Sequence, residues 1–75
     1  MNSDYYFQLG VELTDSGNYQ EAISCFEKAV QVDPQNYTAW LDMGVVYFNL
    51  GEYEKAEKCY KYILKHKPNS DCDGA

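Results

Sequence analysis

Residues 40–68 read WLDMGVVYFNLGEYEKAEKCYKYILKHKP, and residues 6–34 read YFQLGVELTDSGNYQEAISCFEKAVQVDP. The two segments align without a gap at an offset of 34 residues, with glycine on glycine, proline on proline and similar apolar residues in register. Identical pairs include Gly10–Gly44, Gly17–Gly51, Tyr19–Tyr53, Ala22–Ala56, Cys25–Cys59 and Pro34–Pro68. A fixed period of this length indicates a repeated supersecondary unit.

Each copy has the pattern of two helices joined by a short turn. We expect helices over residues 3–16, 18–33, 36–51 and 53–65, with glycines ending the first helix of each copy and prolines following the second. Ser3 and Asn18 are predicted N-caps, and Glu21 completes a capping-box pattern with Asn18. Short loops predict antiparallel neighbours, and no segment alternates as a strand would.

These residues resemble the tetratricopeptide repeat, whose pattern is W-x2-L-G-x2-Y, then A-x3-F, then P. The second copy supplies Trp40, Met43, Gly44, Tyr47, Ala56, Tyr60 and Pro68, and the first supplies Tyr6, Leu9, Gly10, Leu13, Ala22, Phe26 and Pro34. The resemblance implies an all-α fold of two stacked antiparallel helix–turn–helix repeats, an α-solenoid with a right-handed superhelix. We expect units over residues 3–36 and 37–70, and a disordered tail over 71–75.

The signature residues have packing roles, so we do not count them as a functional site. Gly10 and Gly44 are expected to let the two helices of each unit approach closely, with the small residues Ala22 and Ala56 opposite them. The glycine after each first helix permits the sharp reversal of the chain.

The resemblance also implies a concave groove that binds peptide or protein segments and is lined mostly by the first helix of each unit. The positions that face it are Phe7, Gln8, Val11, Thr14 and Asp15 in the first unit, and Leu41, Asp42, Val45, Phe48 and Asn49 in the second. An apolar surface stripe of this kind marks an interaction site. The same side chains could instead pack against each other or a neighbouring copy, and both interpretations stay open.

The best-known ligand of the family is the acidic C-terminal tail of heat-shock chaperones, gripped by a clamp of Lys, Arg and Asn. The corresponding positions here hold Phe7, Val11 and Asp42, none of them basic. Asp15 and Asp42 would repel a carboxylate ligand by Coulomb interaction. We therefore expect an apolar segment, or an apolar segment with basic flanks.

Charge and cysteine content exclude several classes of function. The chain has 75 residues, a net charge of −6 and no Arg, which disfavours nucleic acid as a partner. Three Cys, an odd number without C-x-x-C spacing, fit a reducing compartment, and we expect a cytoplasmic protein. The apolar stretch 39–50 is too short to span a bilayer, so we expect no membrane contact.

Catalysis and cofactor binding are not expected. The single His66 lies near the end of the last predicted helix, where a histidine usually interacts with the helix dipole. Cys59 and His66 are seven residues apart, too far along a helix to share a metal ion. No nucleophile–base pair or glycine-rich phosphate loop is present, and no cofactor is implied.

The two predicted units are fewer than the three that repeat arrays usually need. Residues 1–50 hold one Lys and seven acids, whereas residues 51–68 hold five Lys and three acids, which indicates either a solvated last helix or complementary ends. The uncapped end could be covered by a second copy in a homo-oligomer, by the rest of a longer protein or by a partner. The predicted function is a protein-interaction module; the alternatives are a purely structural self-assembly module and, more distantly, a regulatory domain cut from a larger enzyme.

Overall fold

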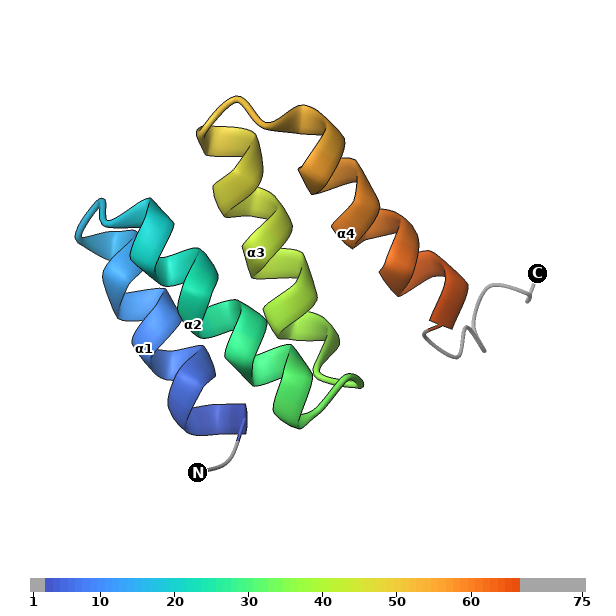
Figure 1. The fold of residues 1–75 in the computed structure, drawn as a ribbon, viewed down its shortest axis with the longest axis horizontal. Coiled ribbons are helices and arrows are strands. Elements are labelled where there is room, and N and C mark those ends of the chain that lie inside the picture. The colour runs from blue at the N-terminus through green and yellow to red at the C-terminus, as the bar shows by residue number, and fades with distance from the viewer. Residues whose placement is uncertain (1–2, 67–75) are drawn as a thin grey trace.

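A computed structural model describes residues 3–66, and within them the chain forms four α-helices and no strand (Figure 1). The helices are α1 (Ser3–Asp15), α2 (Tyr19–Val32), α3 (Tyr37–Asn49) and α4 (Tyr53–His66). Each predicted helix is present, with ends that differ from the prediction by at most two residues. The predicted tail 71–75 with Cys72, and the last residues of the second predicted unit, lie outside the described residues.

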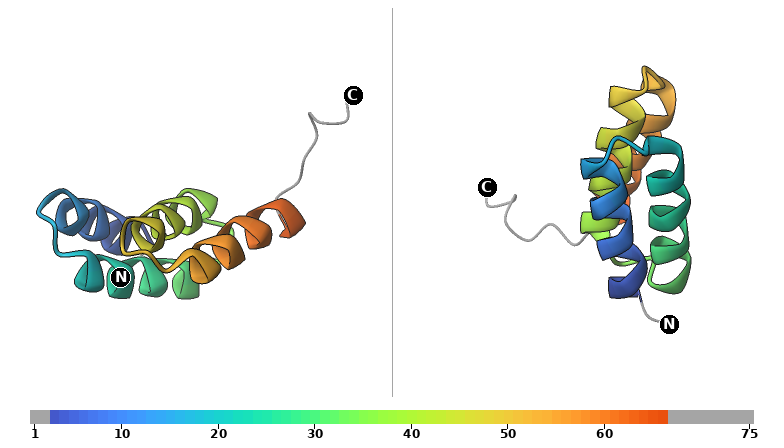
Figure 2. Two further views of the ribbon diagram at one scale, coloured as in Figure 1. Left: turned by 90° about the horizontal axis from the view of Figure 1, so that it is seen from above. Right: turned by 90° about the vertical axis from the view of Figure 1, so that its left-hand side faces the viewer.

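The helices form two antiparallel pairs that stack side by side. Helix α1 packs on α2, α3 packs on α4, and α2 also packs on α3. Figure 2 shows α1 and α3 in one layer and α2 and α4 in the other. The predicted all-α fold of stacked helix pairs is therefore confirmed.

The reversal inside each pair depends on a glycine in a left-handed conformation. Gly17 follows α1 with φ of 85°, and Gly51 follows α3 with φ of 81°. L-residues avoid this region because the Cβ atom approaches the backbone, whereas glycine adopts it without that cost. The predicted role of these two glycines is confirmed.

Two other glycines set the distance between paired helices. A Cβ atom built on Gly10 would lie 2.6 Å from Cε1 of Phe26, and one on Gly44 would lie 2.7 Å from Cε1 of Tyr60. The groups directly opposite the glycines are thus aromatic rings and not the alanines that we expected. Each ring occupies space that any larger residue at the glycine would need.

The core lies between α1, α2 and α3, and α4 adds little to it. Phe26 and Val46 are the largest fully buried side chains. The buried residues of α4 are Ala56 and Cys59. Among the described residues α4 packs on α3 alone, so most of its surface is left uncovered by the other three helices.

The predicted capping of the first two helices is wrong. The Ser3 hydroxyl donates to the Ala29 carbonyl at 3.0 Å, which ties α1 to the end of α2, and the Asn18 side chain makes no capping hydrogen bond. Asn36, the predicted start of the third helix, does cap α3, because its side-chain oxygen accepts from the Ala39 amide at 3.1 Å. Its amide nitrogen also donates to the Ser3 hydroxyl at 2.7 Å.

Candidate functional site

A pocket of about 210 Å³ lies between α1 and α3, and we call it the α1–α3 pocket. Its lining residues are Val11, Thr14, Asp15, Phe26, Asp42 and Val45. Five of these six were predicted from the sequence to face a groove. Phe26 was not predicted, because it comes from α2 and was assigned to packing alone.

Helical spacing explains why these residues share one surface. Val11, Thr14 and Asp15 stand at positions i, i+3 and i+4 of α1, which fall on one face of a helix. Asp42 and Val45 have the i, i+3 spacing on α3. Phe26 reaches the pocket from beneath because Gly10 has no side chain to block its ring.

Exposed apolar side chains of α3 extend the pocket along its surface. Leu41, Val45 and Phe48 are 46%, 42% and 57% exposed. The Phe48 ring leans on Tyr53, with ring centroids 5.0 Å apart, so the start of α4 supports it. We refer to the α1–α3 pocket together with Leu41 and Phe48 as the α1–α3 surface.

The remaining predicted groove residues are placed differently. Phe7 is half-buried, and its ring centroid lies 5.9 Å from that of Phe26, so it packs against the core. Gln8 and Asn49 are exposed and do not line the α1–α3 pocket.

The α1–α3 pocket is acidic and apolar. Asp15 and Asp42 both line it, and no Lys is among its lining residues. Burial raises the pKa of the Asp42 carboxyl, because partial removal from water disfavours its charge. The Thr14 hydroxyl donates to the Gly10 carbonyl at 2.8 Å, so its proton is already engaged. The groups that face the pocket favour a cationic or apolar side chain over an anionic one.

The raised pKa of Asp42 predicts a pH-dependent effect of its replacement. Asp42→Asn removes a charge that folding partly desolvates, so the variant should be more stable than the parent at pH 7. The difference should shrink as the pH falls through the raised pKa toward 3.8, where the carboxyl is also protonated in the unfolded chain. Urea unfolding midpoints of both proteins between pH 3.5 and 7 measure this difference, and a pH-independent difference would contradict the prediction.

The described residues offer few features for other chemistry. Within 3–66, no three His, Cys, Asp or Glu side chains converge on a metal-sized site. The His66 ring contacts that of Tyr62, with centroids 4.2 Å apart and ring planes tilted by 32°, and Cys25 and Cys59 are free thiols. None of the four described helices is both long and apolar enough to cross a bilayer.

Helix pairs of this geometry, with a glycine facing a ring inside each pair, define a helical-repeat scaffold. A sequence profile of the tetratricopeptide repeat matches residues 13–74, and the chain therefore belongs to the tetratricopeptide repeat family. Repeats of this family are generally protein-interaction modules.

Three relatives show how much of a protein this chain can match. The uncharacterized protein MJ0572 of Methanocaldococcus jannaschii is 32% identical over 76 residues, which cover 92% of this chain and 88% of that protein. The mouse protein O-mannosyl-transferase TMTC1 is 36% identical over 91% of this chain, but the match spans 7% of that protein. Anaphase-promoting complex subunit 3 of Schizosaccharomyces pombe is 28% identical over 89% of this chain and 10% of its own length.

Proposed function

We propose that the chain binds a segment of a partner protein on the α1–α3 surface. The observation that carries the proposal is the combination of a pocket of about 210 Å³ with exposed Leu41, Val45 and Phe48 beside it. Contiguous exposed apolar groups are costly in water and mark interaction sites. A partner that covers them stabilises the complex by about 25 cal/mol for each Å² of apolar surface removed from water.

The charge of the α1–α3 surface indicates which segment binds. Asp15 and Asp42 line the pocket without a basic neighbour among its lining residues, so an acidic chaperone-type tail would meet repulsion. An apolar segment flanked by Lys or Arg would place a cation near these carboxylates. We propose such a segment as the ligand, bound without cofactor or catalysis, in a reducing compartment such as the cytoplasm.

Selection from a displayed library of random 12-residue peptides tests this proposal. We expect the bound sequences to be enriched in apolar residues next to Lys or Arg. Val45→Glu should weaken the binding of a selected peptide at least about tenfold, because a carboxylate then replaces a methyl group in the apolar contact. Phe48→Ala should weaken it about fivefold, and isothermal titration calorimetry measures both changes.

Val32→Glu is the matched control for Val45→Glu. Val32 lies on α2 and is 50% exposed, similar to the 42% of Val45, but it is not part of the α1–α3 surface. The control should leave affinity unchanged. If Val45→Glu binds the peptide as well as the parent while circular dichroism shows an intact fold, the proposed site is wrong.

A second candidate function is self-assembly, and the exposure of α4 favours it. Leu64 is 77% exposed, whereas its equivalent in the first repeat, Val30, is 8% exposed beneath α3. A surface that is covered in the first repeat is therefore open in the second. A second copy of the chain, in a homo-oligomer, could cover it.

Head-to-tail stacking of two copies in the repeat register would bury charged side chains. Glu12 and Glu57 occupy the positions of Val46 and Ile23, both of which belong to the buried core. Continuation of the repeat would bury two carboxylates where two apolar side chains now pack, which is costly. Association through α4 would thus need another geometry. Sedimentation equilibrium at high protein concentration tests it, and a monomer there would exclude self-assembly.

A further inference from the structure

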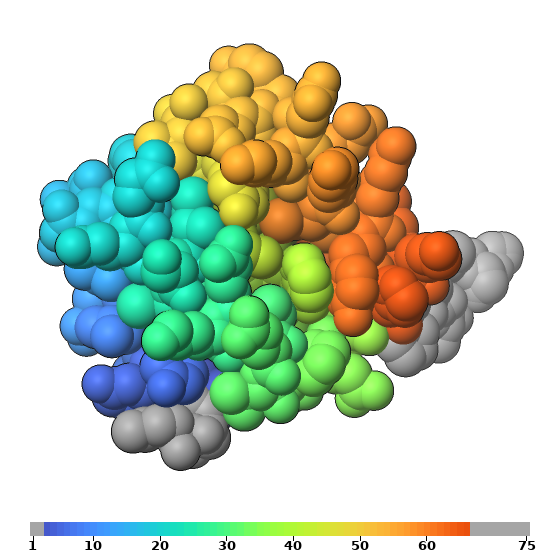
Figure 3. Space-filling model, in the orientation of Figure 1, coloured from blue at the N-terminus to red at the C-terminus, as the bar shows by residue number. Residues whose placement is uncertain are grey.

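A second and larger groove lies on the opposite layer of the molecule, between α2 and α4. Its volume is about 750 Å³, and it is lined by residues of α2, α3 and α4. Figure 3 shows the surface hollowed there, with α3 visible between α2 and α4. Within the described residues α2 and α4 do not contact each other, so α3 forms the floor. We call this feature the α2–α4 groove.

Aromatic side chains hold the floor of the α2–α4 groove in place. The rings of Trp40 and Tyr62 stack with centroids 4.0 Å apart, and the Trp40 indole nitrogen donates to the Pro34 carbonyl at 3.0 Å. Met43 and Tyr47 continue the floor along α3. The groove therefore presents a fixed apolar surface rather than a loose set of side chains.

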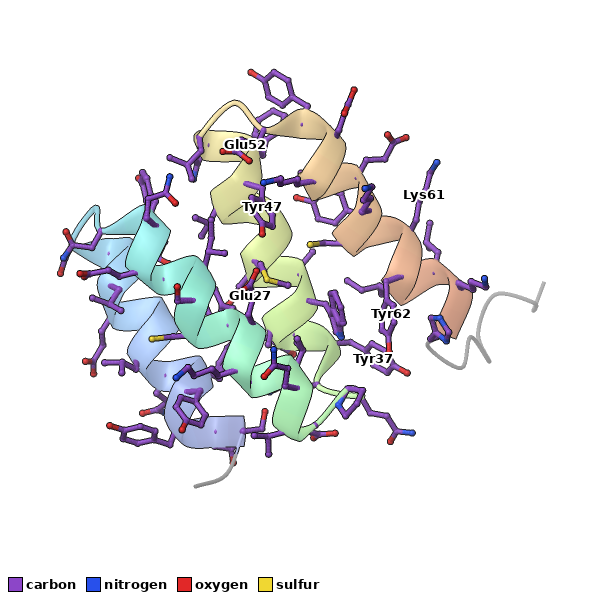
Figure 4. The ribbon with its side chains drawn as sticks, viewed as in Figure 1. Glu27, Tyr37, Tyr47, Glu52, Lys61 and Tyr62 are labelled. Carbon is purple, nitrogen blue, oxygen red and sulfur yellow. The ribbon has the colours of Figure 1, made fainter. Side chains whose placement is uncertain are left out.

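The two walls of the groove carry opposite charges. Glu27 stands on the α2 wall, where it accepts a hydrogen bond of 3.5 Å from the Tyr47 hydroxyl (Figure 4). Lys55 and Lys58 stand on the α4 wall. Lys55 pairs with Glu52 at 3.2 Å, while Lys58 makes no ion pair with any residue of the described part of the chain.

We propose that the α2–α4 groove binds an amphipathic helix of a partner protein, with Lys or Arg along one edge of its apolar stripe and Asp or Glu along the other. The floor and both walls are helices, and a further helix fits between such ridges at about 8–10 Å from the axis of α3. The apolar stripe covers Trp40, Met43 and Tyr47. The basic edge meets Glu27 and the acidic edge meets Lys58. This site lies on the layer opposite the α1–α3 surface and is separate from the proposed function.

The opposite charges of the two walls distinguish a helix with mixed edges from one with uniform edges. An amphipathic helix that reverses its direction in the groove exchanges its two edges. A helix with one basic and one acidic edge therefore matches the walls in one of its two directions, whereas a helix with two equal edges always meets one wall of like charge. The informative comparison is between mixed and uniform edges.

The probes are three designed 18-residue helical peptides without tryptophan, which share one leucine stripe and have mixed, all-Lys or all-Glu edges. Trp40 is the single tryptophan of the chain and lines the groove, so its fluorescence reports binding at this site. At 0.15 M salt, where charges beyond about 8 Å are screened, the mixed peptide should bind at least about threefold more tightly than either uniform peptide. Equal affinities for all three peptides would overturn the proposal.

Two charge reversals in the full chain complete the test. Glu27→Lys makes both walls basic and should shift the preference from the mixed to the all-Glu peptide, and Lys58→Glu should shift it to the all-Lys peptide. Val32→Ala, outside both the α1–α3 surface and the α2–α4 groove, should leave all three affinities unchanged. If the charge reversals leave the peptide preference unchanged, the proposed partner helix is wrong. It is also wrong if Trp40 emission changes with protein concentration in the absence of peptide, and that result would assign the groove to another copy of the chain.

Discussion

Gly10→Ala is expected to lower the free energy of unfolding by about 2 kcal/mol, although alanine favours a helix over glycine by about 1 kcal/mol. The new methyl carbon would lie 2.6, 2.7 and 2.9 Å from three ring atoms of Phe26. That ring is fully buried and packs against Phe7, so it can shift only by giving up contacts in the core. The overlap therefore forces the two helices of the pair apart.

Gly44→Ala is the matched comparison, because the same glycine recurs one repeat later. Its methyl carbon would lie 2.7, 3.0 and 3.2 Å from ring atoms of Tyr60, which is only half-buried and can turn toward solvent. The cost should therefore be smaller, about 1 kcal/mol or less once helix propensity is included. Urea unfolding of both variants measures the difference.

A double variant separates the proposed overlap from a general loss of stability. Phe26→Leu removes the ring atoms that the new methyl group meets, so Gly10→Ala should cost less in that background than in the parent chain. Additive effects, or equal losses for Gly10→Ala and Gly44→Ala, would contradict the close approach as the reason for the glycine.

The helices could be predicted from the sequence because their end signals are local. Gly17 and Gly51 adopt positive φ at the reversal inside each helix pair, and α2 ends before Pro34 because proline cannot continue a helix. The predicted side-chain caps at Ser3 and Asn18 were wrong, and for Ser3 the reason is that its hydroxyl has a distant partner. Ser3 bonds to Ala29, which is 26 residues away.

The candidate site could be predicted in part. Residues one helical turn apart on α1 and α3 share a face, which is why Val11, Thr14, Asp15, Asp42 and Val45 line one pocket. The depth of each side chain was not predictable, because it depends on packing between helices. Phe7, for instance, was predicted to face the groove, but its ring packs against Phe26 and is half-buried.

The α2–α4 groove was not anticipated from the sequence. Its floor residues Trp40, Met43 and Tyr47 belong to the repeat pattern and were assigned to packing alone. The stack of Trp40 on Tyr62 needs the distance between α3 and α4, which the 34-residue period does not supply. The same groove is lined by two weakly acidic groups whose protons respond to burial, the Cys59 thiol and the Tyr47 phenol.

Alkaline pH is expected to destabilise the fold through these two groups. Burial, with a smaller contribution from the charge of Glu27, raises the pKa of the Cys59 thiol from 9.0 to about 11 and that of the Tyr47 phenol from 10.0 to about 12. Both groups keep their protons in the folded chain at a pH where the unfolded chain loses them. Stability is therefore present in full below pH 9 and falls between pH 9 and 12, by about 2 kcal/mol for each group.

Cys59→Ala should remove the contribution of the thiol, so that the loss begins near pH 10 instead of pH 9. It should also reduce the contribution of Tyr47, because the charge of Cys59 helps to raise the pKa of the Tyr47 phenol. Thermal melts in the presence of a reductant, at intervals of half a pH unit, measure how steeply the melting temperature falls with pH. This slope is compared rather than the absolute stability, because the variant also loses a buried sulfur atom. Equal slopes for parent and variant would mean that the Cys59 thiol ionises freely in the folded chain. Its exposure of 4% allows that only if α4 detaches from α3 before the rest unfolds. Because α4 packs on no other helix within the described residues, hydrogen exchange confined to α4 would then identify the detachment as the cause.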